Sequence, residues 1–275
     1  MKQLINEAFS RFGYRVVQDS PLLFHGQDLN HLYREAPWIK YWLELDQQQR
    51  QEVSPFLWEA KAQLGQDLFA IIASSNKKND RPGYFVDIGA SDGIRYSNSW
   101  LLEKNLGWDG IAAEPARSWH ERLTSNRSCI IEKRAIFASS GEILEFLDVS
   151  NKIGYPELSS LSFSKSRDER SSLRTGDASS YTVETVSLTD LLKQHDAPSN
   201  IDFLSIDTEG SEYEIMKSVD FNNYRFASIC IEHNYNKLLR NSIHALLQGH
   251  GYRRVHEAAS AWDDWYIDST DTKAG

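Results

Sequence analysis

Short apolar runs alternate with helix-like segments along two stretches of the chain, residues 64–147 and 181–268. Five of these runs predict strands that are buried on both faces: Tyr84–Ile88, Gly110–Ala113, Cys129–Ile131, Phe203–Ile206 and Ser228–Ile231. Strands that alternate with helices favour a parallel sheet, because a crossover between parallel strands needs a long connection. The pattern therefore predicts an α/β fold with a largely parallel sheet.

Apolar residues at helical spacing fill the segments between and after these strands. Ser97–Leu106 lies between the first two strands and Ser211–Val219 between the last two, and an apolar stripe from Leu239 to Leu247 predicts a further helix. Tyr252–His256 and Trp265–Ile267 then predict a closing antiparallel strand pair at the C-terminal end.

Two segments differ from this alternation. Residues 1–63 are rich in aromatic side chains and interrupted by prolines, which predicts an N-terminal extension of short helices. Residues 151–180 are polar, with nine serines between 159 and 180, and predict an insertion that acts as a mobile lid or is an inert loop. We therefore expect a main domain at 64–268 and a tail at 269–275. Four basic residues of the insertion could reach an anionic ligand: Lys165, Arg167, Arg170 and Arg174.

Composition excludes several classes of protein. The net charge of −9 is unfavourable for a protein whose main partner is the nucleic-acid backbone. No window reaches the ~18 consecutive apolar residues of a membrane span, and residues 1–17 do not have the pattern of a secretory signal. Cys129 and Cys230 each lie in a short apolar run, which predicts buried free thiols. We therefore expect a soluble cytoplasmic protein.

A glycine loop follows the first predicted strand. Asp87 lies two residues before the first glycine, and the loop runs Gly89-Ala90-Ser91-Asp92-Gly93. Glycines at the end of a strand let the backbone approach a ligand closely. The dehydrogenase pattern Gly-x-Gly-x-x-Gly is absent, which disfavours a nicotinamide cofactor. The loop therefore predicts another nucleotide-type cofactor, with an ordinary strand-to-helix turn as the alternative.

Polar residues also follow the other predicted strands. Glu114-Pro115 follows the second strand, where an acid can accept hydrogen bonds from both ribose hydroxyls of an adenosine cofactor. Asp207 follows the fourth strand, and Glu232 and His233 follow the fifth. Because the carboxyl ends of parallel strands meet at one edge of a sheet, we expect these last three residues to converge. They could act as an acid/base pair or hold a metal ion.

The order and spacing of these motifs resemble the FkbM family of S-adenosylmethionine-dependent methyltransferases. The resemblance covers residues 64–268 and is carried by the following segments: Gly65–Asp67, Asp87–Gly93, Glu114-Pro115, Asp207–Glu212, Ile231–His233, Gly251-Tyr252 and Asp263–Tyr266. It implies a Rossmann-like methyltransferase fold and methylation of a hydroxyl group on a sugar, glycan or secondary metabolite. The serine-rich insertion departs from the family.

The resemblance and the strand-end residues together define an expected cofactor site. We assign S-adenosylmethionine to these residues: Asp87, Gly89, Ala90, Ser91, Asp92, Gly93, Asn98, Glu114, Pro115, Arg134, Ala135 and Asp207. The glycine loop would hold the methionine part and Glu114 the ribose, while Arg134 and Ala135 would border the adenine.

The expected catalytic residues are Asp207, Glu232 and His233, with His233 or Asp207 taking the acceptor proton. The same three side chains could hold Mg²⁺ or Mn²⁺, although we expect no obligatory metal. An N-methyltransferase, a nicotinamide oxidoreductase and a non-catalytic carbohydrate-binding protein on the same scaffold are the alternatives.

Overall fold

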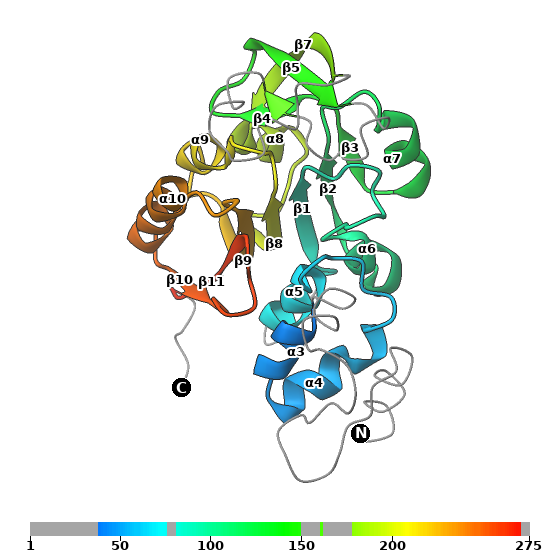
Figure 1. Cartoon of the computed structure of the whole chain (residues 1–275), viewed down its shortest axis with the longest axis vertical. Helices are drawn as coiled ribbons and strands as arrows, with labels where there is room; N and C mark the ends of the chain where they lie inside the picture. The colour runs from blue at the N-terminus through cyan, green and yellow to red at the C-terminus, as the bar shows by residue number, and fades with distance from the viewer. Residues whose placement is uncertain (1–37, 76–80, 150–159, 162–177, 271–275) are drawn as a thin grey trace.

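The computed structural model describes residues 38–75, 81–149, 160–161 and 178–270 (Figure 1). The N-terminal residues 1–37, most of the serine-rich insertion and the last five residues of the tail lie outside the described residues. The expectation that the insertion forms a lid therefore falls largely outside them as well.

A seven-stranded sheet forms the centre of the molecule, with the strand order β10-β11-β9-β8-β1-β2-β3. Neighbouring strands from β9 to β3 are parallel, and their bounds are β1 (Tyr84–Ile88), β2 (Asp109–Ala113), β3 (Ile130–Glu132), β8 (Asn200–Ile206) and β9 (Arg225–Glu232). The last two strands, β10 (Tyr252–Val255) and β11 (Asp263–Asp268), are antiparallel to each other, and β11 is antiparallel to β9. The predicted α/β fold with its closing antiparallel pair is confirmed.

The strand order reverses at β1, which has β2 on one side and β8 on the other. Ligands of open α/β sheets bind in the crevice at such a point, beyond the carboxyl ends of the strands. The register brings three strand ends together, because Ile88 of β1 pairs with Ala113 of β2 and with Ile206 of β8. Glu114 and Asp207 therefore follow immediately on either side of the glycine loop.

Helices cover both faces of this sheet (Figure 1). One face carries α8 (Leu188–Gln194), α9 (Glu212–Lys217) and α10 (Lys237–Gly249). The other carries α3 (Ile39–Glu44), α4 (Gln47–Val53), the 3-10 turn η1 (Ser54–Phe56), α5 (Gln66–Ser75) and α6 (Trp100–Leu106). A further helix, α7 (His120–Asn126), packs Leu123 against Ala112 of β2.

Local sequence signals set the ends of two predicted helices. Helix α6 ends at Gly107, whose φ of +66° is the left-handed conformation that glycine adopts without strain. Helix α8 begins after Ser187, whose side chain accepts a hydrogen bond from the backbone N–H of Asp190 at 3.1 Å. Ser187 is therefore the N-cap of α8.

The short N-terminal helices pack directly on the sheet through aromatic side chains. Tyr41 of α3 makes an edge contact with Trp265 of β11 at 5.0 Å between ring centroids, and Phe69 of α5 stacks on the same ring at 5.0 Å. Glu44 and His256 form an ion-pair contact of 2.6 Å beside this cluster. Tyr41 and Trp42, two aromatic residues of the described part of this segment, are therefore part of the core.

A second, four-stranded sheet has the order β4-β7-β5-β6 and was not predicted as a sheet. Its strands are β4 (Ala135–Phe137), β5 (Ile143–Val149), β6 (Ser160–Leu161) and β7 (Ala178–Ser187). It lies at the end of the molecule opposite the N-terminal helices (Figure 1). The sequence pattern did not indicate this sheet, because β7 pairs with β5, which lies roughly thirty to forty residues earlier in the chain.

Two composition-based expectations can be checked in the described part of the chain. Both cysteines are free, as predicted; Cys230 is buried as expected, whereas Cys129 is only partly buried. Every helix among the described residues is too short or too polar to cross a bilayer.

Candidate active site

A cavity of about 460 Å³ lies at the carboxyl ends of β1, β2, β8 and β9. This volume is within the range of roughly 300–1,000 Å³ that is typical of small-molecule sites. Three groups of residues line it: the glycine loop with Glu114, an apolar wall from the second sheet, and the carboxylates that follow β8 and β9.

The glycine loop is required by the close approach of β1 and β8. Gly89 has a φ of +94°, and a Cβ atom there would lie 1.9 Å from the main-chain oxygen of Asp207. Gly93 has a φ of +79°, and its Cβ would lie 2.7 Å from Cγ of Arg127. Gly89, Ala90 and Ser91 line the cavity, while Gly93 packs against the arginine behind it. Any residue other than glycine would displace the loop at either position.

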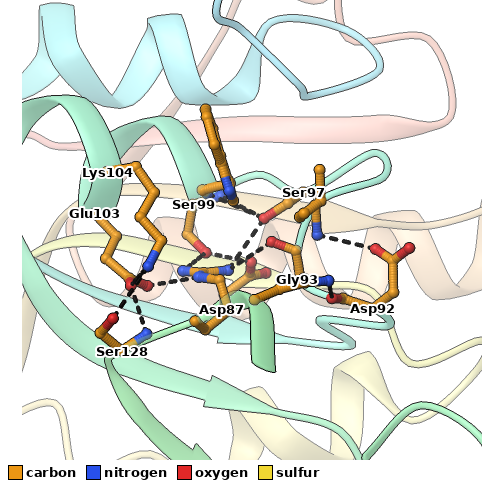
Figure 2. Close-up of polar contacts among 12 residues, drawn as sticks. Asp87, Asp92, Gly93, Ser97, Ser99, Glu103, Lys104 and Ser128 are labelled. Carbon is orange, nitrogen blue, oxygen red and sulfur yellow. Dashed lines mark hydrogen bonds and ion pairs between the residues drawn. The ribbon is translucent and has the colours of Figure 1, made fainter. Parts of the chain in front are cut away.

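Asp92 shapes the loop. Its Oδ1 accepts hydrogen bonds from the backbone N–H groups of Ile94 at 2.9 Å and Arg95 at 2.8 Å. Figure 2 shows Asp92 beside Gly93 at the end of the loop. The carboxylate of Asp92 therefore fixes the turn after the glycines, and its side chain does not line the cavity.

Asp87 lies at the floor of the cavity and is buried. Its Oδ2 accepts a hydrogen bond of 2.5 Å from the hydroxyl of Ser99, and Figure 2 shows the two side chains facing each other. Burial raises the pKa of Asp87, while the hydrogen bond from Ser99 and the charge of Arg127 oppose the rise. Arg127 also pairs with Glu103 at 2.5 Å, so one buried arginine supports both acids.

Glu114 joins the second strand to the glycine loop. Its Oε2 accepts a hydrogen bond from the N–H of Ser91 and its Oε1 one from the N–H of Ala116, each 2.8 Å long. Burial raises the pKa of Glu114 to about 7 despite these two hydrogen bonds. Each carboxylate oxygen keeps a second lone pair, so Glu114 can still accept hydrogen bonds from the two hydroxyls of a ribose. Pro115 lines the cavity beside it.

The two residues expected to border an adenine lie in different positions relative to the cavity. Ala135 lines the cavity. The side chain of Arg134 turns away from it, because the guanidinium is hydrogen-bonded to Glu132 at 2.6 and 2.9 Å and to Gln194 at 2.7 Å. The expected contact between the Arg134 side chain and an adenine does not fit this geometry. Asn98, by contrast, lines the cavity and donates to the hydroxyl of Ser205 at 2.9 Å.

An apolar wall that the sequence did not reveal faces Glu114. It consists of Trp119, Phe146 and Leu161, of which the last two are opposite each other on β5 and β6. Asp148 of β5 accepts hydrogen bonds from the hydroxyl groups of Ser118 at 2.7 Å and Tyr181 at 2.6 Å. These bonds tie the second sheet to the turn that follows Glu114, so the wall is held at a fixed place relative to that acid.

A cluster of three carboxylates lines the opposite side of the cavity. Oxygen atoms of Asp207, Glu209 and Glu232 lie within 4.8 Å of one another. The side-chain amide of Asn234 donates to Glu232 at 2.6 Å and to Glu209 at 3.2 Å. Burial, together with the charges of Asp207 and Glu209, raises the pKa of Glu232 well above its ordinary value. The protonated form of Glu232 is therefore favoured, and Glu232 shares a hydrogen bond with Asp207.

His233 lies behind this cluster and does not meet the expectation of a catalytic base or metal ligand. Its Nδ1 accepts a hydrogen bond from the N–H of Tyr235 at 3.0 Å, so the proton lies on Nε2, which donates to the main-chain oxygen of Asp263 at 3.0 Å. Burial lowers the pKa of His233. With both ring nitrogens bonded to backbone, the imidazole holds the start of β11 in place. Glu209, not His233, completes the set of possible metal ligands.

Asp263 is a cavity residue that sequence reasoning did not assign to the site. It begins β11, pairs in register with Glu232, and accepts a hydrogen bond of 2.8 Å from the amide of Gln66. Burial and the charge of Asp207 raise its pKa to about 7. The sequence signal that could have identified Asp263 as a site residue is the pair Asp263-Asp264 at the start of a mainly apolar strand.

The fold and the cavity define the class of protein. A parallel sheet closed by an antiparallel pair, with a glycine loop after β1 and a buried acid after β2, belongs to the Rossmann-like methyltransferases. The family model of the methyltransferase FkbM domain matches residues 87–254. The chain therefore belongs to the FkbM methyltransferase family.

Two solved structures are similar to the chain. Methyltransferase FkbM from Methylobacillus flagellatus KT has 14% sequence identity and a TM-score of 0.40, over 86% of this chain and 59% of that protein. Precorrin-6y C5,15-methyltransferase from Geobacter metallireducens GS-15 has 15% identity and a TM-score of 0.33, over 68% of this chain and 72% of that protein. The comparison with curated proteins found no match.

Proposed function

We propose that this methyltransferase uses S-adenosylmethionine as methyl donor and transfers the methyl group to a hydroxyl of a sugar, glycan or secondary metabolite. One observation carries the proposal: a single cavity has an adenosine-type acid and glycine loop on one side and a carboxylate cluster on the other. Donor and acceptor would therefore meet between Glu114 and Asp207.

The donor half fits the parts of S-adenosylmethionine. Glu114 supplies two carboxylate oxygens for the ribose hydroxyls. Trp119 and Phe146 supply an apolar surface for the adenine ring, and Gly89 to Ser91 leave room for the methionine part.

The acceptor half contains the groups that a hydroxyl needs. Bound S-adenosylmethionine supplies an electrophilic methyl group, and its transfer to oxygen leaves a neutral thioether and one proton from the acceptor. Asp207 takes this proton, while protonated Glu232 donates a hydrogen bond to Asp207 and orients it. Gln66 and Asp263 lie on the same side of the cavity and can bind further hydroxyl groups.

The three clustered carboxylates would also suit a divalent cation, since Mg²⁺ and Mn²⁺ prefer oxygen ligands. A cation bound by these three carboxylates would leave the residues proposed to bind the methyl donor unchanged. We propose that the ion is not obligatory for methyl transfer.

The test is transfer of a labelled methyl group from S-adenosylmethionine to a panel of glycans, amines and hydroxylated metabolites. We expect labelled ether products and binding of S-adenosylhomocysteine in calorimetry. Labelled amines would replace the O-methyl assignment, and a protein that binds neither nucleoside would contradict the donor assignment. Activity lost in EDTA and restored by Mg²⁺ would show that the metal is required.

A further inference from the structure

The cavity has a strongly uneven distribution of charge. Its carboxyl-bearing side chains are Asp87, Glu114, Asp207, Glu209, Glu232 and Asp263. Arg95 is the one lysine or arginine among the described residues that line it. The carboxylate in the methionine part of a donor would therefore find one cationic side chain at this cavity.

Two contacts hold the Arg95 side chain at the cavity. Its guanidinium lies over the ring of Tyr96, 4.7 Å from the centroid, and its Nη2 donates to the hydroxyl of Tyr96 at 3.2 Å. Tyr96 itself has a φ of +59°, a conformation that is uncommon for a tyrosine, and it also lines the cavity. Although both side chains are exposed, these contacts restrict the guanidinium, which reduces the entropy lost when it forms a further hydrogen bond.

The backbone around Arg95 is fixed by the glycine loop. Asp92 accepts hydrogen bonds from the N–H groups of Ile94 and Arg95, and Asn126 donates to the main-chain oxygen of Asp92 at 2.8 Å. Asp92 and Gly93 can be followed in Figure 2. The loop thus presents Arg95 in a defined direction, which gives a physical role to the acid of the loop that does not itself line the cavity.

The position of Arg95 along the loop corresponds to one part of the donor. Ser91 contacts Glu114, at the ribose end, and Asn98 contacts Ser205 of β8, at the other end. Arg95 lies between these two anchors in the chain. On the proposed function, the segment beyond the ribose is where the methionine part of the donor extends.

We propose that Arg95 binds the carboxylate of the methionine part of the methyl donor through a charge-assisted hydrogen bond. The proposal rests on the proposed function, because it requires the donor to occupy the Glu114 side of the cavity. Arg95 is then a donor-binding residue with no part in proton transfer.

The test compares two nucleosides that differ in one group. S-adenosylhomocysteine has the carboxylate, and S-adenosyl-3-thiopropylamine lacks it but keeps the ammonium group. We expect Arg95→Gln to weaken binding of S-adenosylhomocysteine about tenfold, the order of a charge-assisted hydrogen bond at a partly exposed site, and binding of the amine less than about twofold. Arg95→Lys, which keeps the charge, should recover part of the loss. Calorimetry measures all these affinities.

Arg253→Gln is the matched control, because it removes the same charge from an exposed side chain on the edge strand β10. It should leave both affinities unchanged. The proposal is overturned if the Arg95→Gln variant binds both nucleosides as the wild type does, or loses affinity for both equally. Neither result contradicts the proposed function. Wild-type protein that binds neither nucleoside would instead overturn the proposed function.

Discussion

Two groups of buried carboxylates have opposite electrostatic surroundings in this fold. Four carboxylates away from the cavity are paired with arginines: Glu103 with Arg127 at 2.5 Å, Asp268 with Arg225 at 2.7 Å, Asp264 with Arg240 at 2.7 Å and Asp202 with Arg81 at 2.9 Å. Those at the cavity accept hydrogen bonds from neutral groups. Glu114 accepts from backbone N–H groups, Glu232 from Asn234 and Asp263 from Gln66.

The pKa values show the consequence of this difference. Burial tends to raise the pKa of Glu103, but hydrogen bonds from Lys104 and Arg127 together with the charge of Arg127 bring it to about 2. Burial of Glu114 and Asp263 raises the pKa of each to about 7. The charge of Glu103 is therefore stabilised, whereas the cost of burial is not offset at Glu114 and Asp263. Perturbed acids gathered in one cleft are characteristic of sites that bind or react with a ligand.

The largest effect is expected for Asp207, and it tests whether this carboxylate, among those that line the cavity, is the general base. Asp207→Asn keeps the size of the side chain and removes its ability to accept a proton. We expect methyl transfer to fall by about 10²- to 10⁴-fold, the usual contribution of a general base. The affinity for S-adenosylhomocysteine should stay within about threefold, since Asp207 acts on the acceptor. Wild-type turnover in a folded variant would exclude Asp207 as the base.

The second-largest effect is expected when one of the arginine–carboxylate pairs is broken. Arg127→Met leaves Glu103 and Asp87 without their buried arginine, whose side chain is 0% exposed. Removing one partner of a buried pair typically lowers the free energy of unfolding by ~3–5 kcal/mol. Urea denaturation measures the change. The exposed variant Arg253→Met is the control, and an equal loss in both would mean that the Glu103 pair contributes little.

A smaller effect is expected for donor binding at Glu114. Glu114→Ala removes the acceptor of the ribose hydroxyls and should weaken binding of S-adenosylhomocysteine by ~2 kcal/mol. Calorimetry gives the affinity, and Glu184→Ala on the exposed side of β7 is a control that should bind normally. Unchanged affinity in a folded Glu114→Ala variant would show that another group binds the ribose.

The smallest effect concerns pH. Because the pKa of Glu114 is raised to about 7, this side chain is largely protonated at pH 6 and ionised at pH 8 in the free protein. The ionised form accepts hydrogen bonds from both ribose hydroxyls, so binding of S-adenosylhomocysteine should become about tenfold tighter from pH 6 to pH 8. Glu114→Gln, which does not titrate, should reduce this dependence. The same pH dependence in both proteins would assign it to another acid.

The sequence predicted the main sheet well because each of its parallel strands is a continuous apolar run. The second sheet was missed for the opposite reason. In β5, apolar residues such as Leu144 and Phe146 alternate with Glu145 and Asp148, and the pairing with β7 joins residues far apart in the chain. Pairing of this kind depends on tertiary contacts, which no local window contains.

The candidate site was predicted in part for a similar reason. Because parallel strands end at one edge of a sheet, Asp207, Glu232 and His233 were expected to converge, and the structure brings Asp207 and Glu232 to one cavity together with Glu114. His233 follows Glu232 directly, and successive side chains of an extended chain point in opposite directions. Only one of the two can face the cavity, and the contacts of the imidazole with Asp263 and Tyr235 leave that place to Glu232.

The sequence by itself determined the order of strands and helices, the glycine loop, the acids at the strand ends and the resemblance to FkbM methyltransferases. These features depend on the periodicity and conformation of single segments, which adjacent residues specify. The tertiary structure alone decided which acids receive an arginine and which face the cavity. Gln66 meets Asp263 across 197 residues of sequence and Arg81 meets Asp202 across 121. A carboxylate's charge and reactivity depend on such distant partners and on its burial, and both are properties of the folded chain.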